Sequence, residues 1–109
     1  MDDLFVWESA LEFLTDCKLP VRIAIVSSCD DKLILTLVAC CLNLLNRNIR
    51  VTSDEIAHLS KYSKELHQLA DTSHTLQKKR QLLRGKRYAE ILPHVLRMCL
   101  RSLHNGELE

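Results

Sequence analysis

Glycine and proline are scarce in this sequence, with two residues of each among 109. β-Sandwiches and barrels need many turn residues that accept a positive φ, so this scarcity argues against an all-β fold. Leucine is instead abundant, and 47% of the residues are apolar while 27% are charged. That balance is typical of a folded chain long enough to close one hydrophobic core. We therefore expect a single helical domain over residues 1–109.

Signs of secretion and membrane insertion are also missing. The chain begins Met1-Asp2-Asp3, which is acidic where a secretory signal is positively charged. The longest mostly apolar run, residues 33–45, is too short to span a bilayer. An odd number of cysteines argues for free thiols in a reducing compartment; the five are Cys17, Cys29, Cys40, Cys41 and Cys99. We expect an intracellular protein, in the cytoplasm or nucleus, without a membrane span.

The residue patterns of metal sites and catalytic centres are absent as well. Zinc ligands usually come in closely spaced pairs, and the sequence has neither Cys-x-x-Cys nor His-x₃-His. His94 and Cys99 are separated along one expected helix in a way that suits proton transfer poorly. Gly85 and Gly106 are too isolated to form a phosphate-binding loop. The sequence thus predicts no metal, no cofactor and no enzymatic activity.

Apolar residues recur at the three- and four-residue steps of amphipathic helices. The clearest boundary is Thr52-Ser53-Asp54-Glu55, where a hydroxyl and a carboxylate can form a capping box. Pro20 fits the first turn of a helix, and Pro93 should start or kink the last one. We expect an all-α, compact bundle of five to six short helices around a central apolar helix at about residues 31–46. The expected ranges are 2–17, 20–26, 31–46, 52–71, 76–84 (stopped by Gly85) and 88–104.

Charge is distributed unevenly along the chain, although the net charge is only +1. Residues 1–31 carry seven acidic and two basic side chains, whereas residues 72–109 carry eight basic and three acidic ones. The basic residues gather in the segment 76–87, at Lys78, Lys79, Arg80, Arg84, Lys86 and Arg87. The acidic face of the first expected helix consists of Glu8, Glu12 and Asp16. Such opposite regions can attract each other within one fold or between copies.

The basic segment has three interpretations. Its cations can be the solvated face of a short helix, favoured near the C-terminus by the helix dipole. They could instead contact phosphate in a salt-sensitive way that ignores nucleotide sequence. They could also dock on the acidic first helix of another copy. In each case Leu76, Leu82, Leu83 and the stem of Arg80 would face the core.

Aromatic side chains are few, at 5% of the residues. Phe5, Trp7 and Phe13 all fall in the first expected helix, where they could anchor a partner. A chain with so few large side chains needs them in its interior, however. We therefore expect these three to pack in the core.

An ordered series of short motifs runs from Leu42 to Leu96. It comprises Leu42–Leu45, Asn48-Ile49, Thr52, Leu69-Ala70, Leu76, Lys79-Arg80, Leu82-Leu83, Gly85, Leu92-Pro93 and Val95-Leu96. In these positions the sequence resembles short, uncharacterised helical proteins encoded by Maverick/Polinton-like elements, adintovirus-like agents and related animal DNA viruses. The resemblance implies a small protein of a DNA virus or virus-like element, such as an internal virion component.

The sequence also departs from that group. Its members usually have paired glycines and a heavily basic fourth helix, whereas here Gly85-Lys86-Arg87 replaces the pair and His58, Ser60 and Ser63 lie on that helix. The resemblance therefore supports a role in condensing DNA less strongly for this chain, and a protein-binding role more strongly.

Two functional hypotheses follow. The first is a non-enzymatic small viral or mobile-element protein, structural or virion-associated, whose basic C-terminal third contacts nucleic acid or a capsid partner. The alternative is a helical adaptor between proteins that self-associates through its acidic and basic faces. Under both, charge reversal at Lys78, Lys79 and Arg80 is expected to abolish binding without lowering thermal stability.

Overall fold

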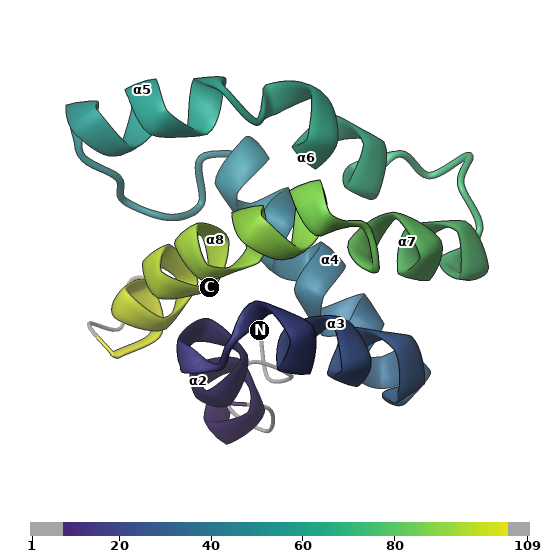
Figure 1. Ribbon diagram of the computed structural model, residues 1–109. Helices are drawn as coiled ribbons and strands as arrows, with labels where there is room; N and C mark the ends of the chain where they lie inside the picture. The colour runs from purple at the N-terminus through teal and green to yellow at the C-terminus, as the bar shows by residue number, and fades with distance from the viewer. Residues whose placement is uncertain (1–7, 105–109) are drawn as a thin grey trace.

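The structure is a computed structural model that describes residues 8–104, and seven helices make up this part of the chain (Figure 1). They are α2 (Glu8–Asp16), α3 (Leu19–Ser28), α4 (Asp31–Leu45), α5 (Ser53–Ser60), α6 (Ser63–Ala70), α7 (Leu76–Leu83) and α8 (Lys86–His104). No strand occurs between residues 8 and 104, so the predicted all-α fold is confirmed. The expected start of the first helix, at residues 2–7, lies outside the described residues.

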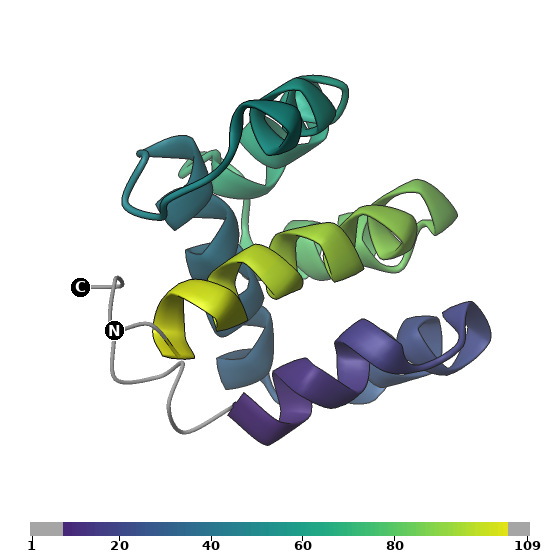
Figure 2. The ribbon, with the colours of Figure 1, turned by 90° about the vertical axis from the view of Figure 1, so that its left-hand side faces the viewer.

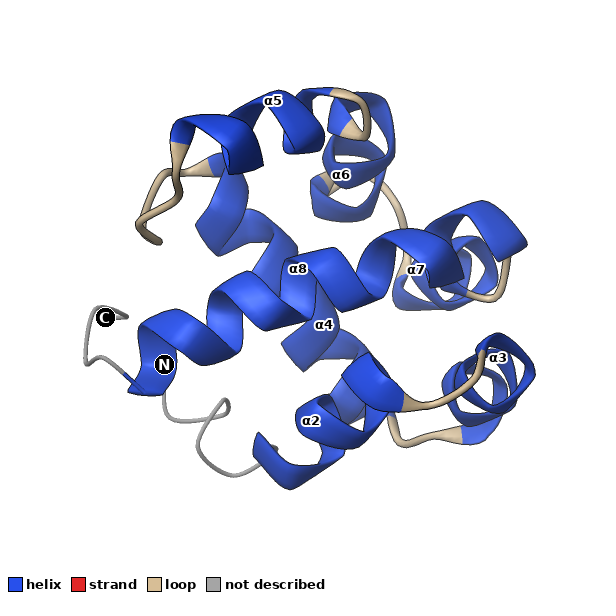
Figure 3. Ribbon diagram, turned by 60° about the vertical axis from the view of Figure 1, so that its left-hand side comes forward, coloured by secondary structure: helices blue, strands red, loops and turns tan. Residues whose placement is uncertain are grey.

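Two helices, α4 and α8, cross at the centre of the bundle (Figure 3). Helix α8 packs against α2, α3, α4 and α7, while α4 packs against α6, α7 and α8. Figure 2 shows the helices in three tiers, with α5 and α6 above, α7 and α8 between, and α2 and α3 below. The prediction of a central apolar helix at residues 31–46 holds for α4, but α8 shares that place. Leu35 on α4 is 53% exposed, so α4 is not buried all round.

The fourth expected helix, residues 52–71, is two helices, so the prediction of five to six helices was too low. Its start is as predicted, because the Thr52 hydroxyl accepts from the Glu55 amide and the Glu55 carboxylate accepts from the Thr52 amide, at 3.1 and 2.8 Å. The helix then breaks at Lys61 and Tyr62. This break lets α6 lay the buried Leu66 on α4 while α5 keeps no fully buried residue.

Helix α2 turns Phe13 away from the core. Leu11, Leu14 and Thr15 are buried on the opposite side, at 0, 1 and 7% exposure, whereas Phe13 is 57% exposed. The predicted core packing of Phe13 was therefore wrong: the face of α2 that meets α8 is already occupied by the two leucines. The corresponding predictions for Phe5 and Trp7 lie outside the described residues.

All five cysteines have free thiols, as expected. Cys40, Cys41 and Cys99 are buried where α4 meets α8, and Cys17 and Cys29 are half-buried. Burial raises the pKa of Cys41 far above that of an ordinary thiol. The central thiols therefore pack as small apolar groups in their protonated form.

A proline inside α8 is accommodated by a buried arginine. Pro93 has no amide hydrogen, so it cannot bond the carbonyl of Ala89 one turn earlier. The Arg22 guanidinium, 6% exposed, donates to that carbonyl at 3.0 Å. It also donates to the carbonyls of Leu14 and Cys17 at the end of α2, both at 2.7 Å. Arg22 thereby fastens α2 and α3 to α8.

Candidate functional site: an apolar pocket beside Arg47

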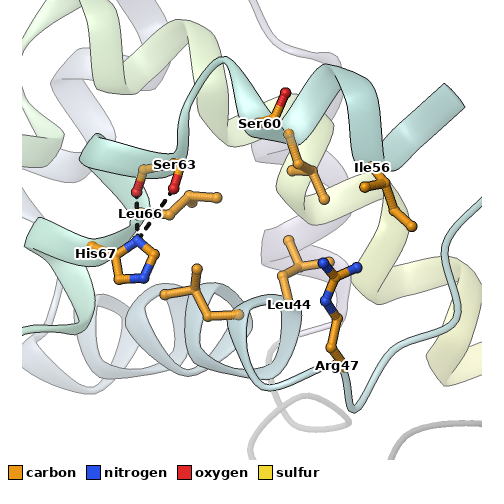
Figure 4. A pocket seen from close by; sticks show the side chains of 9 residues that line it. Leu44, Arg47, Ile56, Ser60, Ser63, Leu66 and His67 are labelled. Atoms are coloured by element: carbon orange, nitrogen blue, oxygen red, sulfur yellow. Dashed lines mark hydrogen bonds between the residues drawn. The ribbon is translucent and has the colours of Figure 1, made fainter. Parts of the chain in front are cut away.

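A pocket of about 250 Å³ opens between the C-terminal end of α4 and the α5–α6 pair (Figure 4). Its apolar lining comes from three helices: Leu44 and Leu45 of α4, Ile56 and Leu59 of α5, and Leu66 of α6. Leu44 and Leu66 are buried, whereas Ile56 is 40% exposed at one end of the pocket. The break between α5 and α6 creates this hollow, because it swings α5 away from the line of α6. The site therefore depends on a feature that the sequence did not predict.

Arg47 follows α4 in a backbone conformation that usually belongs to glycine. Its φ is 60°, and it is the one residue with positive φ, glycines apart, in the described chain. The Arg47 amide donates to the Leu44 carbonyl and the Asn48 amide to the Asn43 carbonyl, which together form a Schellman motif. An L-residue in this left-handed position costs about 1–2 kcal/mol relative to glycine's freedom. Strain of this kind gathers at functional positions.

The Arg47 side chain stands at the rim of the pocket. In Figure 4 it rises beside Leu44 toward Ile56, at the end opposite His67. Within residues 8–104 its guanidinium has no hydrogen bond or ion pair. An exposed, unpaired guanidinium beside aliphatic side chains can accept a carboxylate in two parallel hydrogen bonds. The pocket thus combines an apolar lining with one available cation.

The other end of the pocket holds Ser63 and His67, and Ser60 lies between the two ends (Figure 4). The Ser63 hydroxyl lies 3.4 Å from Nδ1 of His67, a pairing that in other settings marks a nucleophile and its base. Here the same Nδ1 lies 2.8 Å from the Ser63 carbonyl oxygen, to which it must donate its hydrogen. A nitrogen that carries its proton cannot remove one from the hydroxyl. This end of the pocket is therefore polar.

The predicted basic segment is only partly available for binding. Arg80 donates to Asp31 at 2.7 Å and to the Val26 carbonyl at 3.0 Å, and its side chain is 13% exposed. Arg87 pairs with Glu65 at 3.0 Å and lies 5.0 Å above the Tyr62 ring. Both arginines tie helices together. The place of Arg80 and Arg87 in the predicted partner-binding set stays a prediction, although each already has an internal acidic partner; the Arg87 side chain is 55% exposed.

The rest of the segment remains at the surface. Lys78, Arg84 and Lys86 are exposed and Lys79 is half-buried, around the end of α7 and the start of α8. Gly85 joins the two helices, and a side chain there would come within 3.2 Å of the Leu82 carbonyl. These four cations form a smaller group than the six predicted, which we call the α7–α8 basic group.

The predicted acidic face divides into two parts. Glu8 and Glu12 turn toward His104 at the end of α8, with oxygen-to-Nε2 distances of 2.5 and 3.8 Å. Their ligand atoms and that of His104 lie within 4.8 Å of one another, which makes them the group between residues 8 and 104 that could hold a metal ion. All three side chains are more than a third exposed, and solvated groups commonly meet in this way without an ion. Asp16 stays exposed on α2.

The chain matches no protein-family model, no curated protein and no solved structure. The resemblance to proteins of Maverick/Polinton-like elements and related viruses therefore stays a prediction. Across the part of the chain that the structure describes, no helix is both long and apolar enough to cross a membrane.

A second, shallower pocket of about 230 Å³ lies between α5 and α8. His58 and His94 meet there with their ring centroids 4.4 Å apart, and Asp54 and Arg97 line the same hollow. Burial lowers the pKa of His94, and the nearby His58 and Arg97 add to that effect. The neutral form of His94 is therefore favoured, which suits an aromatic packing contact between the two helices.

Proposed function

We propose that the protein is a non-enzymatic helical interaction protein that docks an acidic, amphipathic segment of a protein partner in the pocket beside Arg47. The observation that carries the proposal is Arg47, whose backbone takes a glycine-like conformation and whose guanidinium is unpaired within the described residues. A purely structural helix end would be more stable with glycine at this position. A function of the arginine side chain would explain why the strained residue is present here in place of glycine.

The size of the pocket supports a protein segment over a small molecule. Pockets for small ligands usually measure about 300–1,000 Å³, so 250 Å³ is small for such a ligand. The volume suits one or two apolar side chains of a helix laid across α5 and α6. A carboxylate one turn along that helix would meet Arg47, because residues three or four apart share a helix face.

Replacing Arg47 with glycine should separate binding from stability. We expect Arg47→Gly to raise the free energy of unfolding by about 0.5–1 kcal/mol, because the left-handed strain disappears. The same variant should bind an acidic helical peptide about tenfold more weakly, since one ion pair is lost. Two peptides serve as probes: a single leucine flanked by glutamates, and the same peptide with lysines. Urea unfolding and NMR titration measure the two effects.

The control for that experiment is Arg84→Ala, which removes an exposed cation outside the pocket. It should leave peptide affinity unchanged. The proposal fails if both peptides bind wild type equally, or if peptide-induced NMR shifts avoid Leu44, Ile56 and Leu66. Arg47→Glu adds a sharper outcome, because it should reverse the preference in favour of the lysine peptide.

A second candidate function rests on the α7–α8 basic group. Its four cations have no hydrogen-bond or ion-pair partner among the described side chains. They support the hypothesis of a small viral or mobile-element protein that contacts nucleic acid or a capsid partner. Four phosphate contacts on duplex DNA predict a slope of log affinity against log salt of about −3 to −4. Fluorescence anisotropy with a short labelled duplex measures that slope.

The matched variants for the nucleic-acid test lie on different surfaces. Lys78→Glu with Lys86→Glu should abolish DNA binding. Lys18→Glu with Lys32→Glu should weaken it only slightly, because Lys18 directly precedes α3 and Lys32 lies on α4, both outside the group. Equal losses in the two pairs would show that binding follows net charge alone. No DNA binding at low salt would remove this candidate.

A further inference from the structure

The most exposed large apolar side chain in the described chain is Phe13 of α2, at 57%. Asp16 lies three residues later on the same face of the helix, because positions three apart are neighbours on a helix surface. Asp16 is exposed and forms no ion pair among residues 8–104. Phe13 and Asp16 thus form an apolar knob with a carboxylate beside it, which we call the α2 knob.

The α2 knob has the chemistry that the pocket requires. The pocket offers aliphatic side chains for an apolar group and Arg47 for a carboxylate. We propose that the α2 knob of one copy docks in the Arg47 pocket of a second copy, with Phe13 among Leu44, Ile56 and Leu59 and Asp16 against Arg47. This inference rests on the proposed function of the pocket and names its partner.

The positions of the two surfaces determine what such docking would build. Helix α2 lies in the lower tier and the α5–α6 pair in the upper tier, on either side of α8 (Figures 1 and 2). One copy cannot fill its own pocket across that distance. Two copies that exchange knobs reciprocally would form a closed dimer. Contact in one direction only is heterologous and would build a closed ring, or an open chain with one knob and one pocket free at its ends.

The charge pattern favours a second copy over other occupants. Asp16 and Arg47 are both unpaired within the described residues and have opposite signs. Docking would satisfy both groups and cover the exposed parts of Phe13 and Ile56 at once. One aromatic knob and one ion pair bury less surface than the roughly 1,200 Å² at the low end of stable interfaces. Association should therefore be weak and concentration-dependent.

Sedimentation velocity tests the inference with two complementary variants. Phe13→Ser removes the knob and keeps the pocket, while Ile56→Glu blocks the pocket and keeps the knob. Wild type should show a mass that rises with concentration up to about 1 mM, the range of weak complexes. Each variant alone should stay at the 12.6 kDa of one chain. An equimolar mixture should form a 1:1 complex of twice that mass and grow no further.

Three results would overturn the inference: wild type that stays monomeric, Phe13→Ser that still associates, or a mixture that stays monomeric. Leu35→Ser is the matched control, because Leu35 is 53% exposed on α4 and lies outside knob and pocket. It should associate as wild type does. Titrating Phe13→Ser with the acidic peptide tests the pocket separately, since this variant cannot occupy its neighbour. Peptide binding without self-association would reject the second copy and keep the proposed function.

Discussion

Replacing Arg22 with methionine is expected to lower the free energy of unfolding by about 3–5 kcal/mol, because a buried side chain that serves three carbonyls would be lost. Methionine keeps much of the apolar stem and removes the guanidinium. The carbonyls of Leu14, Cys17 and Ala89 would then lose their donor, and the bond to Ala89 joins segments 67 positions apart in the sequence. Urea unfolding followed by circular dichroism measures the loss.

Pro93 provides a way to confirm the cause. Pro93→Ala returns an amide hydrogen to α8, and that hydrogen points at the Ala89 carbonyl. In the Arg22→Met background, the new bond should raise the free energy of unfolding by about 0.5–1.5 kcal/mol. In the wild-type background the Ala89 carbonyl already accepts from Arg22, so Pro93→Ala should raise the free energy of unfolding by less. The difference is a coupling energy between Arg22 and Pro93. Zero coupling would mean that Arg22 acts through its stem or its charge.

Features governed by neighbouring residues were predictable from the sequence. The capping box at Thr52 and Glu55 forms as expected, because both partners lie within one turn. Pro20 lies in the first turn of α3, as its fixed φ suggested. The inward face of α8 follows the helical period of its apolar residues, with Leu92, Val95 and Leu96 all buried. In each case the deciding interaction is local or follows from the helical period.

Features governed by distant contacts were not predictable. Whether Arg80 faces water depends on Asp31, which lies 49 positions earlier, and no local pattern specifies that pairing. Phe13 looked like a core residue by type, yet two leucines of α2 already fill the face toward α8. Arg47 was missed for another reason. Asn46-Arg47-Asn48 marks the end of α4, but the sequence does not show which residue takes positive φ.

Long-range arginines replace the glycine caps that this chain largely lacks. Arg22 donates to the end of α2, Arg80 to the end of α3, and Arg87 to the Lys61 carbonyl at the end of α5. The last carbonyls of a helix have no partner within it, and arginine side chains can satisfy them while complementing the helix dipole. Three of the 15 basic side chains thus satisfy helix ends.

Charge reversal at Arg80 should consequently destabilise the fold, contrary to what the sequence suggested for this segment. Arg80→Glu removes the bonds to Val26 and Asp31 and places a second carboxylate beside Asp31. We expect a loss of roughly 2–3 kcal/mol, the range for a charged hydrogen bond whose acceptor is left unpaired. Urea unfolding measures it, and 1 M salt should diminish the part that comes from Asp31, which is 70% exposed.

Lys78→Glu is the matched control on the same helix, because Lys78 is exposed and has no ion-pair partner among residues 8–104. Its stability should change by no more than about 0.5 kcal/mol. Equal changes in the free energy of unfolding for the two substitutions would contradict the conclusion that Arg80 stabilises the contact between α7 and α3. The contrast also matters for any binding assay. A loss of DNA or partner binding in Arg80→Glu would report a weakened fold, whereas the same loss in Lys78→Glu would report the surface, so only the lysine variants can test the α7–α8 basic group.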